Sequence, residues 1–220
     1  MRHPRFLNLL ILFLALLLVA QPLPAGAQGD DTQEQIDALL DTLRNGDLLE
    51  QEQAAQELAE LGSRLAVPGL IDIFQSTDNP RPAAMALAGI GTPTAMVALI
   101  APLADDELTA RRNAAQIALL EVGEDAVSPL RGGLASGNPV MRRNAAELLG
   151  FISSPSAVNS LLQVALADDD PRVRQEAVWA LGEIGEPRIR LTLRSIYRTD
   201  PDPGVRFEAQ RAVLRLGEMF

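Results

Sequence analysis

The sequence contains no cysteine and no lysine, and its only histidine is His3. Without cysteine, no disulfide stabilises the chain and no thiolate can act as a nucleophile. Because no histidine follows His3, the chain after this position cannot form a Ser-His-Asp triad or a typical zinc site. We therefore expect no catalytic residue, no metal and no cofactor, and a protein that is not an enzyme.

Basic residues are also scarce. All 19 of them are arginine, against 29 Asp and Glu, which gives a net charge of −10. An acidic chain repels phosphate backbones, so nucleic acid is excluded as an expected partner. The charge is uneven along the chain: residues 28–130 hold 18 acidic residues and 5 arginines, whereas residues 131–220 hold 11 and 12.

The N-terminus has the layout of an export signal. Three basic residues stand within the first five positions, an apolar run follows from Phe6 to Ala20, and Ala25-Gly-Ala27 offers a small-x-small cleavage site. We expect residues 1–27 to be a signal peptide, cleaved after Ala27, and the protein to be exported to the periplasm or the cell exterior. The alternative is an uncleaved membrane anchor, but the run of about 15 residues is shorter than the roughly 20 that span a bilayer. The mature chain is then expected to have no membrane span.

A repeated helical unit fills the rest of the chain. In Asp170–Gly185, an acid and a proline suit a helix start, apolar residues follow at three- and four-residue steps, and glycines end the unit. Similar starts occur at Asn138–Arg142 and Asp202–Arg206. The small residue at the centre of each copy is Ala54, Ala83, Ala114, Ala145, Ala177 or Ala209, at spacings of 29 to 32 residues. A period of this length is typical of a solenoid.

The unit resembles HEAT repeats, most closely the short HEAT-like subtype also found in phycobilisome lyases. The resemblance covers Asp47 to Phe220 and is strongest where Asp/Asn-Pro-x-Val/Met-Arg stands intact. It implies an all-α fold, an α-solenoid of about six two-helix repeats. No long linker divides the chain, so residues 28–220 are expected to form a single domain.

The resemblance also implies that the helix after each Asp-Pro turn lines the concave side of the solenoid. The arginines of the turn motif and the neighbouring acids are then expected to form a structural ladder of Asp–Arg contacts between successive repeats. Its members are Arg111, Arg142, Asp170, Arg174, Asp202 and Arg206. For the acidic run Asp168–Asp170 we prefer helix capping over the alternative of a Ca²⁺ or Mg²⁺ site.

Three columns of residues are expected to face the groove. Their members stand two positions before, two positions after and six positions after each reference alanine. From these columns we predict a partner-binding surface formed by Arg81, Met85, Arg112, Arg143, Phe151, Trp179, Phe207 and Arg211. Arginine and tryptophan are frequent interface hot spots, and an arginine stripe suggests an anionic segment on the partner. The alternative is that Phe151 and Trp179 fill the core and that four arginines are solvated or paired within the chain, namely Arg111, Arg112, Arg142 and Arg143.

These features predict an exported scaffold that binds a protein or peptide through its concave face. One alternative is an accessory or chaperone-like subunit of an envelope or pigment-binding complex. Another, raised by the lyase resemblance, is a bilin lyase-like enzyme. A metal-dependent HEAT hydroxylase is not expected, because such enzymes carry His-Glu pairs that this chain lacks. The apolar C-terminal edge, with Leu214, Met219 and Phe220, is a further candidate surface, for a dimer.

Overall fold

A computed structural model describes residues 27–107 and 109–217 of the chain. The chain divides into two compact units, Met1–Ala38 and Leu39–Phe220, and the division falls inside one helix. The predicted export signal lies outside the described residues except for Ala27.

The described residues form twelve α-helices and four short 3-10 helices, without a strand. The α-helices are α2 (Ala27–Asn45), α3 (Leu48–Leu61), α4 (Val67–Ser76), α5 (Arg81–Ile90), α6 (Pro93–Ile100), α7 (Ala110–Val122), α8 (Glu124–Gly133), α9 (Pro139–Ile152), α10 (Val158–Ala167), α11 (Pro171–Ile184), α12 (Arg190–Thr199) and α13 (Pro203–Gly217). The 3-10 helices are η1 (Arg64–Ala66), η2 (Ala101–Ala104), η3 (Pro155–Ala157) and η4 (Pro187–Ile189). In the two described ranges, no helix is both long enough and apolar enough to cross a bilayer.

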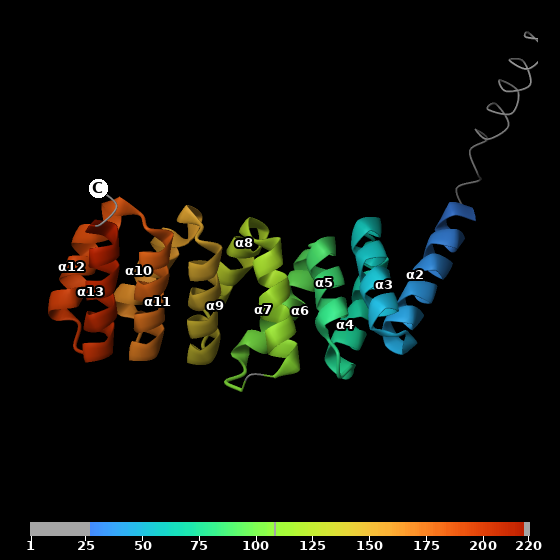
Figure 1. Ribbon diagram of the computed structural model, residues 1–220, viewed down its shortest axis with the longest axis horizontal. Coiled ribbons are helices and arrows are strands. Elements are labelled where there is room, and N and C mark those ends of the chain that lie inside the picture. Colours follow the sequence, from blue (N-terminus) through green and yellow to red (C-terminus); the bar gives the residue numbers. More distant parts are fainter. Residues whose placement is uncertain (1–26, 108, 218–220) are drawn as a thin grey trace, which may run out of the picture. The chain divides into compact units, whose positions relative to one another are not determined.

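The helices of residues 39–220 stack in two layers. Each of α3, α5, α7, α9, α11 and α13 contacts the next of this set, and we call this set the first layer. Helices α4, α6, α8, α10 and α12 pack against the first layer, and the stack runs from α3 in cyan to α13 in red (Figure 1). Along the chain, α2 to α13 follow one another as six pairs. The predicted all-α solenoid of about six two-helix repeats is confirmed.

Local signals set the ends of the first-layer helices. At the start of α11, the Asp170 side chain accepts a hydrogen bond from the backbone N–H of Arg172 at 2.8 Å, and Pro171 occupies the first helical position. At its end, Gly185 has a left-handed backbone with φ of 73°, as glycine readily allows. Ser153 adopts the same conformation after α9, with φ of 56°.

Small residues let neighbouring first-layer helices approach closely. A Cβ atom at Gly150 of α9 would lie 2.6 Å from Cζ3 of Trp179 and 2.9 Å from Cα of Ala180, both on α11. A Cβ atom at Gly182 of α11 would lie 2.9 Å from Cβ of Ala212 on α13. Any side chain at these two glycines would therefore push the helices apart.

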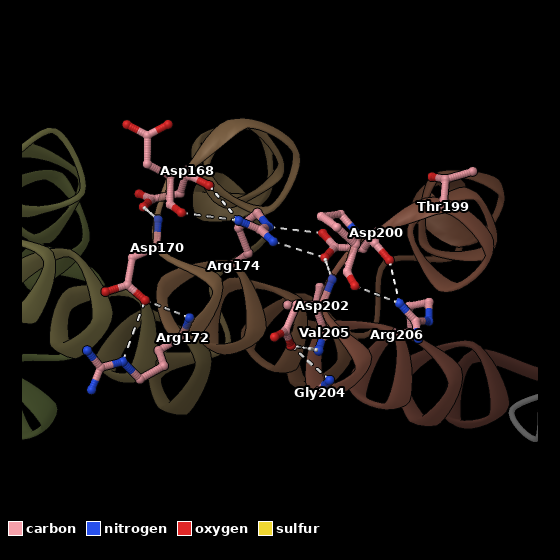
Figure 2. A network of polar contacts seen from close by, with 12 residues as sticks. Asp168, Asp170, Arg172, Arg174, Thr199, Asp200, Asp202, Gly204, Val205 and Arg206 are labelled. Carbon is pink, nitrogen blue, oxygen red and sulfur yellow. Dashed lines mark hydrogen bonds and ion pairs between the residues drawn. The ribbon is translucent and has the colours of Figure 1, made fainter.

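Arginine–aspartate pairs connect successive repeats. Arg142 donates from Nε to Asp168 Oδ2 at 2.6 Å and from Nη2 to Asp168 Oδ1 at 2.8 Å. Arg174 makes the same two-bond contact with Asp200, at 2.9 and 3.0 Å. The third guanidinium nitrogen, Nη1, donates to a backbone carbonyl of the preceding turn, as Figure 2 shows for Arg174 and Arg206. We call these contacts the ladder.

The ladder corrects two predicted partners. Asp170 and Asp202 do not accept hydrogen bonds from the predicted ladder arginines; instead, they cap helices α11 and α13, and Asp202 Oδ1 accepts from the N–H groups of Gly204 and Val205. The acids that pair with arginine stand two residues earlier, where the preceding helix ends. Only there does a carboxylate point toward the previous repeat, whereas the cap carboxylate points at its own helix.

The surroundings of each ladder acid keep it ionised. Burial alone raises the pKa of Asp168, but hydrogen bonds from Arg142 and from the Asp170 N–H, with the charges of Arg142 and Arg174, lower the pKa below its ordinary value overall. The pKa of Asp200 is lowered in the same way through Arg174. Because the folded-state pKa is lowered, this stabilisation is present above the ordinary pKa and is lost as the pH falls through the folded one.

We predict that Asp168→Asn lowers the free energy of unfolding by about 2–4 kcal/mol at pH 7, because it leaves the half-buried Arg142 guanidinium without its carboxylate. Urea unfolding followed by circular dichroism measures the change. The control is Asp169→Asn, whose side chain is exposed and caps nothing, and which should change the free energy by less than about 0.5 kcal/mol. Equal effects of the two substitutions would show that the ladder is not a source of stability.

Candidate functional site

The exposed side of α9, α11 and α13 presents side chains spaced four residues apart. Four residues are close to one helical turn, so residues at this spacing lie on one face of a helix. Nine residues occupy these positions: Arg143, Glu147 and Phe151 on α9, Gln175, Trp179 and Glu183 on α11, and Phe207, Arg211 and Arg215 on α13. Because α11 packs against both α9 and α13, the nine form one continuous surface, which we call the grid.

Three aromatic side chains cross the grid. Phe151 is 57% exposed and Phe207 is 61% exposed, while Trp179 is half-buried. The rings of Phe151 and Trp179 meet edge to face, with centroids 5.0 Å apart and planes at 67°. The indole of Trp179 packs over Gly150 of the neighbouring helix α9, which holds the ring in place. Phe151 and Phe207 are thus surface residues, and the alternative that Phe151 fills the core is wrong.

The arginines of the grid have acidic partners within the chain. Arg143 donates to Asp106 at 2.9 Å, and Arg211 donates to Glu208 at 3.0 Å. Arg215 pairs with Glu183 of the neighbouring helix. A stripe of free arginines, which the sequence suggested, is therefore absent from the described residues of α9, α11 and α13.

The prediction that Arg112 faces a partner is wrong. Its side chain is buried, 9% exposed, and Nη1 donates to the backbone carbonyls of Asp105 and Asp106 at 3.2 and 3.1 Å. Arg112 thus makes the backbone contacts of a ladder arginine, which we had assigned to Arg111. Arg111 is exposed and donates to the Gln75 carbonyl at 3.3 Å.

The error comes from a one-residue shift in the third repeat. The helix-ending residues Gly91, Ser153 and Gly185 each follow the reference alanine by eight positions. Counting back eight positions from Gly123 gives Ala115, not Ala114. Aligning the repeats on these helix-ending residues, rather than on the alanines, would have found the shift.

Two carboxylates at the grid have no cationic partner of their own. Glu147 and Glu176 accept no hydrogen bond from any described residue and form no ion pair with one. Burial raises the pKa of Glu176 to about 7, with further increases from the charges of Glu147 and Glu208 and a decrease from Arg143. Sequence reasoning missed this cluster. A signal was present, because Glu176 and Glu208 occupy equivalent positions in adjacent repeats, which places like charges side by side.

The same side of the first layer is hollowed nearer the N-terminus. An open cavity of about 920 Å³ lies between α3 and α5 and the end of α7. The predicted partner residues Arg81 and Met85 line it, together with the acidic side chains Glu52, Glu121 and Asp125. Its floor is formed by small residues such as Ala55 and Gly89, which explains why the surface is hollow here.

Two further places were singled out in the sequence: the acidic run Asp168–Asp170, with a cation site as the less favoured alternative, and the C-terminal edge. In the part of the chain whose side chains are described, no three His, Cys, Asp or Glu side chains lie together in an arrangement that could hold a metal ion. At the C-terminal edge, Leu191 is 73% exposed and Leu214 is 57% exposed. Met219 and Phe220 lie outside the described residues.

The comparisons with known proteins identify the repeat. The family of HEAT repeats matches residues 127–214. No curated protein sequence matches the chain. Among solved structures, human deoxyhypusine hydroxylase is similar at 21% identity and a TM-score of 0.47, over 90% of this chain and 92% of that one. A designed armadillo repeat protein in complex with a (KR)4 peptide is similar at 18% identity and a TM-score of 0.43, over 82% of this chain and 99% of that one. The complex of CpcE and CpcF of phycocyanin lyase from Nostoc sp. is similar at 22% identity and a TM-score of 0.35, over 82% of each chain.

One of these findings corrects a prediction. From the residue content we expected that the chain is not an enzyme, yet human deoxyhypusine hydroxylase, an enzyme, is among the structures similar to it. The exclusion of enzymatic activity is therefore withdrawn.

We predict that Glu176→Gln stabilises the fold at pH 8 and has a much smaller effect at pH 5. A carboxyl group whose folded-state pKa is raised contributes stability that is present below the ordinary pKa of 4.5 and lost as the pH rises through about 7. Because the group is partly exposed, we expect about 1–2 kcal/mol at pH 8, less than the full shift would give. Thermal unfolding at both pH values measures this.

The matched control for this prediction is Glu57→Gln on α3, which removes an exposed carboxylate of the first layer. It should leave the pH dependence of the melting temperature unchanged. If Glu176→Gln also leaves it unchanged, the half-buried carboxyl does not titrate as described.

Proposed function

We propose that this HEAT-like repeat protein binds a peptide segment of another protein along the exposed face of its first helix layer. The observation that supports this best is the placement of Phe151, Trp179 and Phe207 on the outer face of three successive first-layer helices. Each aromatic ring stands one turn earlier on its helix than the ring on the preceding helix, so a single segment can cross all three.

The energetics of such a surface favour binding. Aromatic side chains bury large areas at low entropic cost, and Phe151 and Phe207 expose theirs to water. Trp179 needs little further ordering, because Phe151 and the α9 backbone at Gly150 already hold its ring. Ion pairs around the rim, such as Arg211–Glu208, orient polar groups next to the apolar centre.

The spacing of the helices sets the form of the ligand. Neighbouring helices pack about 8–10 Å apart, and an extended chain advances about 3.3 Å per residue, so roughly three residues of a bound segment span one repeat. A segment of about nine residues would therefore cover the grid. A longer one, continued along the first layer, would reach the 920 Å³ cavity at Arg81 and Met85.

We predict that the double substitution Trp179→Ala/Phe207→Ala weakens binding at least tenfold, because it removes two of the three anchors. Peptides that bind are first selected from a random library with the wild-type protein as bait. Isothermal titration of the selected peptides against the variant then measures the loss, and circular dichroism checks that the fold is intact.

The matched control removes two exposed leucines of the even-numbered helices, in Leu166→Ala/Leu191→Ala, where Leu166 is 59% and Leu191 is 73% exposed. Binding should change less than twofold. If the leucine variant loses binding and the aromatic variant retains it, the other layer holds the site. If no library peptide binds the wild-type protein at all, the peptide-binding proposal fails.

We further infer that the protein is exported. The basic start, the apolar run Phe6–Ala20 and the Ala25-Gly-Ala27 site support this. Full-length protein expressed in a Gram-negative host should then appear in the periplasmic fraction, with an N-terminal sequence that begins at Gln28. A variant with Phe6–Ala20 deleted should stay in the cytoplasm. Periplasmic protein that still begins at Met1 would favour an anchor, and wild-type protein confined to the cytoplasm would contradict export.

A further inference from the structure

The charge at the grid determines which peptide fits it. Each grid arginine is engaged by an acid of this chain: Arg143 by Asp106, Arg211 by Glu208 and Arg215 by Glu183. The carboxylates of Glu147 and Glu176 are left over, and no described residue donates a hydrogen bond to either. The unpaired charge beside the aromatic rings is therefore negative, which is the opposite of what the arginine columns of the sequence suggested.

The surroundings of Glu176 explain why its charge is uncompensated. The charges that act on Glu176 are those of Glu147 and Arg143 on α9 and of Glu208 on α13, the two helices packed on either side of α11. Arg143 is directed to Asp106, and Glu208 is already bonded to Arg211. The remaining neighbour, α10, contains no ionisable residue. Among the described residues of α9, α10 and α13, no cation forms an ion pair or a hydrogen bond with Glu176.

We propose that the grid recognises a basic segment of the partner, with one Lys or Arg side chain seated between Glu147 and Glu176 beside the Trp179 ring. This inference rests on the proposed function and names the chemistry of its ligand. Apolar residues on either side of the cation would contact Phe151 and Phe207, the two exposed rings.

Three interactions favour this occupant over a neutral or acidic one. A guanidinium or ammonium group supplies the missing hydrogen-bond donors to both carboxylates, and such charge-assisted bonds are the stronger kind. It also lies near an indole face, which attracts cations. Finally, it offsets the repulsion that the charges of Glu147 and Glu208 exert on the ionised Glu176. An acidic segment would add to that repulsion.

Binding of a cation here should depend on pH. Glu176 is ionised in the free protein only above a pKa of about 7, where it attracts the cation most strongly. Below that pH the carboxyl is protonated and its attraction is lost. Because the bound cation favours the ionised form, binding near pH 7 should also release a proton.

The test uses three peptides without tryptophan that differ only at one central residue, either arginine, glutamine or glutamate, between flanking leucines. Trp179 is the only tryptophan in the sequence, so its fluorescence reports binding at the grid directly. We expect the arginine peptide to bind about tenfold more tightly than the glutamine peptide at pH 8, and this preference to shrink to about threefold or less at pH 6.

The double variant Glu147→Gln/Glu176→Gln should lose the preference for arginine while it still binds the glutamine peptide. The control variant Glu57→Gln/Glu60→Gln removes two carboxylates of α3, away from the grid, and should keep the preference. Circular dichroism of both variants shows whether they are folded.

Every other result would overturn the inference. Equal affinity for the arginine and glutamine peptides would leave peptide binding standing and remove the role of the carboxylates. Tighter binding of the glutamate peptide would indicate an acidic partner. If none of the peptides changes the Trp179 fluorescence while library peptides still lose affinity on Trp179→Ala/Phe207→Ala, the grid binds peptides but does not select this cation.

Discussion

The two-bond contact between an arginine and an aspartate is the interaction on which the C-terminal half of the solenoid depends. Arg142 with Asp168, and Arg174 with Asp200, join the start of one first-layer helix to the turn that precedes the next one. Each arginine also holds a backbone carbonyl of its own turn. The contact thus fixes the position of the turn and the spacing of two helices at once. A flat, bidentate guanidinium is suited to this role, which a lysine could not fill in the same way.

The same pairing explains the distribution of charge on the grid. A guanidinium committed to a ladder contact cannot reach a ligand, and the arginines of the grid are also held by acids of this chain. What remains available is a set of aromatic rings and two carboxylates. The net charge of a surface region in this protein is therefore what remains after charges within the chain have paired. A count of arginines and acids does not predict its sign at any one place.

The fold could be predicted from the sequence because each repeat contains its own local signals for where a helix starts and ends and which side is buried. Asp170 with Pro171 starts a helix, Gly185 ends it, and the apolar positions between them define its buried side, as found. The site could be predicted only in part. Trp179, Phe151 and Phe207 lie where the repeat register placed them, but Arg112 does not, because the third repeat is shifted by one residue. The pairing of each charge could not be predicted, since it depends on which of two acids in a turn points to the neighbouring repeat.

Gly150 has a further meaning beyond helix spacing. The absence of a side chain on α9 makes the shelf on which the indole of α11 rests, so the orientation of Trp179 is determined by a residue in the preceding repeat. Adjacent repeats are thus not interchangeable modules at this place. A designer who moves the grid to another solenoid has to transplant the pair of helices, because the tryptophan alone would lack its support.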